Sequence, residues 1–216
     1  MARTRSAVLA EIDATGVVAV IRAATGAQVV DICRALVAGG VTACEVTMTT
    51  PDAIEAIARA TAEIGDQALV GVGTVLDAGT AQEAILAGAQ FVVSPTLDLS
   101  VIAMAHQYDR PVMPGALTPT EILAAWTAGA DVVKVFPANH FGPTYFHDLK
   151  GPLPQVRLTP TGGVDLGTAA DWIKAGAVCL GVGGALVRRD LVEAADWAGL
   201  SALAARYVEI VRQARA

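Results

Sequence analysis

The chain has 216 residues, of which 54% are hydrophobic and 17% charged, and its formal net charge at pH 7 is −6. A chain of this length is expected to form one domain, residues 1–216, whose core is large enough to need no disulfide or metal. The negative charge without a basic cluster argues against a nucleic-acid partner. No stretch reaches the roughly 18 consecutive apolar residues of a membrane span, so we expect no membrane partner.

The N-terminal segment and the cysteines both favour a cytoplasmic protein. Residues 1–5 carry two arginines, but acidic Glu11 and Asp13 follow instead of an apolar run, so we expect no secretory signal peptide. The cysteine count is odd and each cysteine has apolar neighbours, which predicts reduced core residues. They are Cys33, Cys44 and Cys179.

Short apolar strands alternate with helical stretches along the chain. The strands are predicted at residues 17–21, 43–47, 68–71, 91–94, 111–113, 132–135, 156–159 and 178–181. Between them, apolar residues recur three and four positions apart, as at Val29, Cys33 and Leu36, which is the spacing of an amphipathic helix.

Several helical stretches have start and stop signals. Thr118 offers an N-cap side chain, with Pro119 at the first helical position and Glu121 three residues after the cap. Residues 50–52, Thr-Pro-Asp, predict a similar start. An Ala-Gly pair precedes a strand in four places, and its glycine fits a left-handed helix end. These places are residues 38–40, 87–89, 128–130 and 175–177.

The alternation of strands and helices is not interrupted by a Pro/Ser-rich linker or a low-complexity stretch. Eight strand–helix units in so short a chain predict a (β/α)8 TIM barrel, and the alternative is a doubly wound open sheet. In such a barrel the reactive groups lie at the C-terminal ends of the strands.

Lys134 stands out among these strand ends. It is one of three lysines in the chain and the only one embedded in an apolar strand. Burial of an ammonium group is costly and depresses the pKa of a lysine, and the neutral amine can attack a ketone to form a Schiff base. The alternative is a lysine that snorkels or forms a salt bridge at the rim of the barrel.

Two further charged residues follow strands. Glu45 lies in another apolar strand and could move protons during imine formation and carbon–carbon cleavage. Its alternative role is that of a structural partner of Lys134 or Arg22. Arg22 directly follows the first strand and could bind a carboxylate through two hydrogen bonds, or lie solvated at the rim.

Glycine-rich segments follow the last two strands, at residues 161–163 and 181–184. In a (β/α)8 barrel these loops often form a phosphate site from backbone N–H groups. After the third strand, a tight glycine turn is expected to place Thr74 near the centre. The histidines match no metal-binding spacing, so we expect no metal and no cofactor. They are His106, His140 and His147.

Taken together, these strand ends resemble the 2-keto-3-deoxy-6-phosphogluconate (KDPG) and 4-hydroxy-2-oxoglutarate (KHG) aldolase family. The resemblance runs from about residue 17 to about residue 190, nearly the whole chain, in the right order. The Lys-x-Phe-Pro segment together with Pro-Thr-Gly-Gly is specific as a set. The matching stretches are residues 18–22, 38–41, 45–47, 71–75, 93–95, 113–115, 133–137, 160–163 and 181–184.

The resemblance implies a class I (Schiff-base) aldolase, a pyruvate-forming carbon–carbon lyase of Entner–Doudoroff carbohydrate metabolism, commonly a homotrimer. The implied substrate is a small 2-keto-3-deoxy sugar acid, foremost 2-dehydro-3-deoxy-6-phosphogluconate, which gives pyruvate and glyceraldehyde 3-phosphate. Alternatives are 4-hydroxy-2-oxoglutarate, 2-dehydro-3-deoxy-6-phosphogalactonate or an unphosphorylated 2-keto acid.

The resemblance also implies roles for individual residues. Lys134 matches the Schiff-base lysine and Glu45 the general acid/base. The residues around the pyruvyl group are Thr74, Pro95 and Phe136. The residues at the phosphate end are Thr161, Gly162, Gly163, Gly183 and Gly184.

The chain departs from the family pattern in two places. Some members have an arginine after the Glu-Val-Thr strand to hold the pyruvate carboxylate, but here Thr49 stands there, so that role moves to Arg22. Many members have a serine where this chain has Gly184, which removes a hydroxyl from the phosphate end and leaves phosphorylation of the substrate open. Two other classes also stay open: a phosphate-binding isomerase or synthase without an imine, and a non-catalytic binding barrel.

Overall fold

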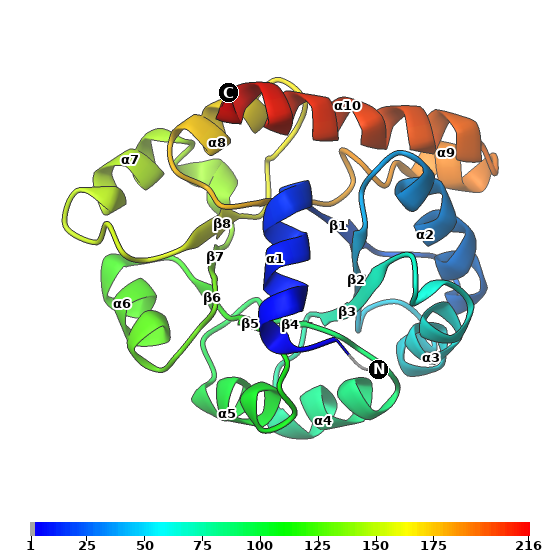
Figure 1. Ribbon diagram of the computed structural model, residues 1–216, viewed down its shortest axis with the longest axis horizontal. Coiled ribbons are helices and arrows are strands. Elements are labelled where there is room, and N and C mark those ends of the chain that lie inside the picture. Colours follow the sequence, from blue (N-terminus) through cyan, green and yellow to red (C-terminus); the bar gives the residue numbers. More distant parts are fainter. Residues whose placement is uncertain (1–2) are drawn as a thin grey trace.

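The structure is a computed structural model that describes residues 3–216. Met1 and Ala2, which belong to the segment assessed for a signal peptide and to the expected domain 1–216, lie outside the described residues. A ring of short parallel strands is surrounded by helices (Figure 1).

Nine strand segments form the ring within residues 3–216. They are β1 (Val17–Ile21), β2 (Ala43–Thr47), β3 (Leu69–Gly73), β4 (Val92–Val93), β5 (Val112–Met113), β6 (Gly115–Ala116), β7 (Val133–Val135), β8 (Leu158–Pro160) and β9 (Leu180–Val182). Their order is β5-β4-β3-β2-β1-β9 in one sheet and β6-β7-β8 in the other. The expected strands are all present, with ends that differ by no more than two residues.

Two seams join the sheets into a closed barrel. At the first, the Lys134 N–H donates to the Pro114 carbonyl at 2.9 Å, and the Gly115 N–H donates to the Thr96 carbonyl at 3.2 Å. At the second, a parallel bridge pairs Thr161 with Gly181. β5 and β6 are therefore two parts of one barrel strand, split at Pro114 because proline has no N–H to donate. The expected (β/α)8 barrel is confirmed, and the open doubly wound sheet is wrong.

The helices lie outside the ring, with one exception. They are α1 (Arg5–Thr15), α2 (Val29–Ala38), α3 (Ala53–Ile64), α4 (Ala78–Leu86), α5 (Leu99–Gln107), α6 (Pro119–Thr127), α7 (Thr144–Lys150), α8 (Ala169–Lys174), α9 (Arg189–Glu193) and α10 (Trp197–Arg215), with 3-10 turns η1 (Gly26–Gln28) and η2 (Ala138–His140). The exception is α1, which lies across the centre of the ring (Figure 1).

Helix α1 covers the N-terminal end of the barrel. Its Val8 and Ile12 are fully buried, in one apolar cluster with residues from the strand beginnings such as Val18, Leu69 and Val132. This apolar contact closes one end, so the opposite end, where the strands terminate, is the one available for chemistry.

The predicted helix signals have mixed outcomes. The capping box of α6 is confirmed, because the Thr118 side chain accepts from the Glu121 N–H and the Glu121 carboxylate accepts from the Thr118 N–H. The similar start at residues 50–52 is confirmed in position, because α3 begins at Ala53, but Asp52 adopts a left-handed conformation and makes no side-chain cap. The left-handed helix ends are confirmed by positive φ angles at Gly40, Gly88, Gly129 and Gly176. All three cysteines are free and buried.

Candidate active site

Two charged side chains meet inside the C-terminal half of the barrel. Lys134 lies on β7 and Glu45 on β2, and three barrel strands separate β2 from β7 in either direction around the ring. Because they come from opposite walls, both side chains reach the barrel axis, where Lys134 Nζ lies 4.0 Å from Glu45 Oε1. Only 5% of Lys134 and 2% of Glu45 is exposed, so the interpretation of Lys134 as a snorkelling rim residue is wrong.

The carboxyl of Glu45 is short of partners. Its Oε1 is buried and accepts no hydrogen bond within the described chain. Burial raises the pKa of Glu45, and the attraction of Lys134 and Arg22 opposes this effect without cancelling it. A carboxyl with a raised pKa and an unused oxygen can accept a proton from a bound molecule and return it.

The residues expected around the pyruvyl group come after three barrel strands, β3, β4 and β7. The ring centroid of Phe136 is 5.2 Å from Lys134 Nζ, within the range of a cation–π contact. Thr74 follows β3 with φ 62°, an uncommon conformation for a residue with a Cβ, and is half-buried. A Cβ on Gly115 would lie 2.2 Å from the Pro95 carbonyl group, so the Pro95 backbone lies directly against the strand that pairs with Lys134.

A cavity of about 230 Å³ brings the remaining predicted residues together beside this centre. We call it the glycine cavity. Its predicted members are Arg22, Phe136, Thr161, Gly162, Gly163, Gly183 and Gly184. Arg22 is exposed, and its Nη1 lies 3.8 Å from the position of a Cβ on Gly183.

The two glycine loops differ in how strictly they require glycine. Gly162 and Gly163 have φ angles of 91° and 73°, which residues with a Cβ rarely adopt. A Cβ on Gly184, in contrast, would have no atom within 4 Å. Steric space therefore permits a side chain at 184.

Sequence reasoning missed Asp165, which also lines the glycine cavity. Its Oδ1 accepts hydrogen bonds from the N–H groups of Gly167 and Thr168, at 2.9 and 3.0 Å. The available signal was its place just after the glycine turn, at the start of the segment that leads into α8.

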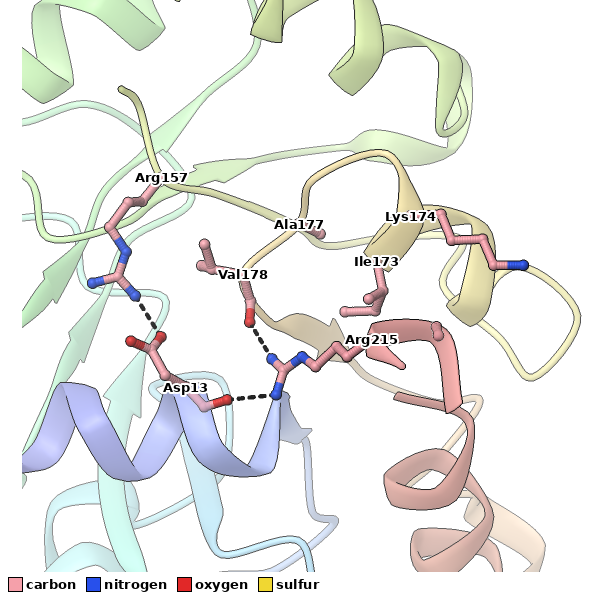
Figure 2. Close-up of a pocket in the computed structure, with 8 residues that line it drawn as sticks. Asp13, Arg157, Ile173, Lys174, Ala177, Val178 and Arg215 are labelled. Carbon is pink, nitrogen blue, oxygen red and sulfur yellow. Dashed lines mark hydrogen bonds and ion pairs between the residues drawn. The ribbon is translucent and has the colours of Figure 1, made fainter. Parts of the chain in front are cut away.

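Another cavity, of about 730 Å³, lies at the other end of the barrel (Figure 2). There the Arg215 guanidinium donates to the Asp13 and Val178 carbonyls, at 2.7 Å each, and Arg157 pairs with the Asp13 carboxylate. These contacts tie the end of α10 to α1 and to the start of β9. We assign them a structural role, because they lie among the strand beginnings, away from Lys134.

Two further properties concern the described chain as a whole. Residues 3–216 contain no group of three or more His, Cys, Asp or Glu side chains placed to hold a metal ion. Among the helices of the same residues, none combines the length and apolar character needed to cross a membrane.

Comparison with known proteins agrees with this geometry. Residues 8–203 match the family described as KDPG and KHG aldolase. The chain belongs to this family. The aldolase is 39% identical over 183 residues to the 2-dehydro-3-deoxy-phosphogluconate aldolase of Treponema pallidum, a match that spans 84% of this chain and 87% of the relative. It is 38% identical over 182 residues to the KHG/KDPG aldolase of Escherichia coli K12, spanning 83% and 84%.

A solved structure adds chemical detail for a relative. The KDPG aldolase of Legionella pneumophila, with pyruvate captured as a covalent carbinolamine, superposes with a TM-score of 0.82 at 27% identity, covering 91% of this chain and 95% of that one. The family expected from the strand ends is thus confirmed, and the protein is an aldolase, a carbon–carbon lyase. A non-catalytic barrel and an isomerase or synthase are accordingly wrong.

Proposed function

We propose that this aldolase binds a 2-keto-3-deoxy sugar acid as a Schiff base on Lys134 and splits it into pyruvate and an aldehyde, with Glu45 as the proton carrier. The observation that carries the proposal is the buried pair across the barrel axis, with Nζ 4.0 Å from Oε1. At that separation the amine and the carboxyl make no close direct contact with each other. The amine can therefore attack a substrate carbon while the carboxyl exchanges a proton with a hydroxyl of the same substrate or with a water.

The proposed reaction runs through an iminium ion. The unprotonated Lys134 amine attacks the 2-keto carbon, and loss of water gives the iminium. Glu45 then takes the proton of the C4 hydroxyl, directly or through water, while the C3–C4 bond breaks and its electron pair moves toward the iminium nitrogen. The aldehyde leaves, the resulting enamine is protonated at C3, and water hydrolyses the imine to release pyruvate and free Lys134.

The substrate-binding roles are proposals of the same kind. Phe136, Thr74 and Pro95 would surround the pyruvyl part, because they lie at C-terminal strand ends on the same side of the barrel as the Lys134 side chain. Arg22 would hold the substrate carboxylate through its guanidinium. The backbone N–H groups of the loops at 161–163 and 183–184 would hold the phosphate end.

The proposed substrate is 2-dehydro-3-deoxy-6-phosphogluconate, giving pyruvate and glyceraldehyde 3-phosphate, because relatives that match most of the chain carry this activity in their names. The absent side chain at Gly184 keeps 4-hydroxy-2-oxoglutarate, 2-dehydro-3-deoxy-6-phosphogalactonate and unphosphorylated 2-keto acids as alternatives. A retro-aldol panel of these compounds, with pyruvate release as the readout, ranks them by kcat/KM.

Borohydride reduction in the presence of pyruvate tests the mechanism. Reduction of the imine should fix a pyruvate-derived adduct on Lys134, identified by peptide mass spectrometry, and Lys134→Arg should remove it. Lys174, on the exposed end of α8, is the internal control and should stay unmodified. Absence of the adduct from Lys134 would overturn the Schiff-base mechanism.

We also propose that the protein is a single domain over residues 1–216, a homotrimer and cytoplasmic, with a place in Entner–Doudoroff metabolism. Support for assembly comes from an apolar depression on α5 and α6, in which the side chains of Leu99 and Leu123 are exposed. Leu123→Glu should convert a trimer to monomers in size-exclusion chromatography with light scattering, while an unchanged mass would place the interface elsewhere. One cooperative unfolding transition is expected of the monomeric variant.

A further inference from the structure

A second cavity, of about 380 Å³, lies next to the glycine cavity at the catalytic end of the barrel. It is formed by the loop that follows β1 and by the segment of α9, and we call it the outer cavity. Arg22 lines both cavities and lies at the boundary between them. Phe136, two residues from Lys134, lines the glycine cavity but not the outer one, so the outer cavity is the more distant from the amine.

The charges of the two cavities differ. In the glycine cavity, the positive charge of Arg22 is matched by the negative charge of Asp165. In the outer cavity, Arg22 and Arg189 face one acid, Glu193, which gives a net charge of +1. Glu193 engages only Nε of Arg189, at 2.6 Å. An anionic group is therefore better matched by charge in the outer cavity.

The rest of the outer cavity suits a hydroxylated chain. Val187 and Val192 supply apolar surface, as do two alanines of the loop after β1. Gln28 also lines it, and its Oε1 is buried without a hydrogen-bond partner in residues 3–216. A buried amide oxygen without a donor is costly, and a ligand hydroxyl reached by rotation of the amide would satisfy it.

We propose that the outer cavity is a binding subsite for the distal end of aldehydes longer than three carbons, namely hydroxylated aldose phosphates of four carbons or more. The proposal rests on the proposed function, because the subsite extends that site past Arg22. A three-carbon aldehyde places its phosphate in the glycine cavity. A longer chain passes Arg22, which holds the carboxylate, and its phosphate lies against the guanidinium group of Arg189.

The subsite can be measured in the direction of synthesis. The pyruvate enamine on Lys134 attacks the aldehyde carbon, the new carbon–carbon bond forms, the aldehyde oxygen takes a proton from Glu45, and water hydrolyses the iminium to release the product. The quantity compared is the ratio of kcat/KM for erythrose 4-phosphate to kcat/KM for glyceraldehyde 3-phosphate, each with saturating pyruvate.

Two neighbouring arginines make a matched pair of variants. Arg189→Ala should lower the ratio by about ten-fold, the loss expected for one charge-assisted hydrogen bond. Arg188→Ala should leave the ratio unchanged, because Arg188 is also exposed to solvent and paired with Asp190, but does not line the outer cavity. Val192→Phe should also lower the ratio, because the larger side chain occupies the cavity without a change of charge.

Three results would overturn the subsite: a wild-type enzyme that uses the three-carbon aldehyde but not the four-carbon one, equal ratios in the two arginine variants, or an unchanged ratio in Val192→Phe. Failure of the proposed function looks different. In that case neither aldehyde gives an aldol product, and borohydride with pyruvate leaves Lys134 unmodified.

Discussion

A Cβ atom on Gly73 would lie 1.9 Å from Oε1 of Glu45. The same atom would lie 2.5 Å from Cδ and 2.6 Å from Cγ, so the entire end of the glutamate occupies the space that any other residue would need. The two residues sit on adjacent strands, with Gly73 the last residue of β3. The missing side chain at 73 thus leaves room for the carboxyl that lies near Lys134 at the barrel axis.

Gly73→Ala is expected to displace the Glu45 carboxyl and lower kcat by about a hundred-fold, the usual scale of one misplaced acid/base group. KM should change little, because Gly73 is not among the residues that line the glycine cavity. Steady-state kinetics of the retro-aldol reaction measure both constants.

A second substitution tests whether Gly73→Ala acts by displacing the Glu45 carboxyl or by disturbing the fold in general. Glu45→Asp shortens the side chain by one methylene and should reduce the clash in the Gly73→Ala background, because it removes the oxygen that would lie at 1.9 Å. The same change should lower kcat in the wild-type background. The double variant should therefore be at least as active as Gly73→Ala alone. Additive losses would contradict the positioning role.

The raised pKa of Glu45 predicts a cost in stability that depends on pH. Below the ordinary value of 4.5, Glu45 is protonated in both the folded and the unfolded state. As the pH rises toward the raised pKa, the unfolded state loses this proton first, so the free energy of unfolding falls. Glu45→Gln removes the titration, and should be inactive yet more stable than the wild type at pH 8, with a smaller difference at pH 4.5.

Thermal unfolding at the two pH values measures this difference, since about 1 kcal/mol corresponds to roughly 2–4 °C in Tm for a protein of this size. Glu83→Gln, on the exposed face of α4, is the matched control and should show no such dependence. A Tm difference for Glu45→Gln that does not grow with pH would contradict the raised pKa.

Lys134→Arg should lower kcat by more than about a thousand-fold, because a guanidinium remains protonated and cannot attack the keto carbon. Arginine keeps the positive charge near Glu45, so the folded structure should persist in circular dichroism. Lys174→Arg should retain wild-type kcat. Substantial activity in Lys134→Arg would indicate a reaction without an imine.

Gly184→Ser tests whether a phosphate lies in the glycine cavity. A side chain at 184 meets no atom within 4 Å, so the change should leave the fold intact. An added hydroxyl donor should lower KM for a phosphorylated substrate by roughly two- to ten-fold, and should have no effect on the unphosphorylated analogue. Gly184→Ala is the control for the added bulk, and an equal effect of both variants would argue against a hydrogen bond to phosphate.

Most of the barrel strands could be predicted from the sequence, because the apolar runs in the sequence coincide with the buried strands of the fold. β1 and β2 have the predicted bounds, since apolar runs bounded by helix-end glycines leave little choice of register. The division of the fifth barrel strand at Pro114 was not predicted, although its cause is a single residue that cannot donate a hydrogen bond to its neighbour. Helix α1 was not predicted, because its role depends on residues from strand beginnings across the whole ring, such as Val18 and Val132.

The active site likewise has residues that the sequence identifies and features that it does not. Lys134 and Glu45 could be singled out as charges within apolar strands, but their separation depends on the closure of the ring, which no local pattern encodes. Asp165 and Arg189 were missed because exposed charged residues after a strand have no spacing that distinguishes them from solvated ones. Their relation to the cavities comes only from the way the loops after β1, β8 and β9 lie beside each other.

Helix α1 also affects the order in which the two products leave the active site. With Val8 and Ile12 buried against the strand beginnings, the barrel has one open mouth, and whatever reacts must arrive and depart through it. In the proposed mechanism the pyruvyl group is held covalently on buried Lys134, and the aldehyde half lies between it and solvent. The aldehyde must therefore leave first and pyruvate last, so pyruvate should compete with substrate for the free enzyme, whereas the aldehyde should inhibit noncompetitively.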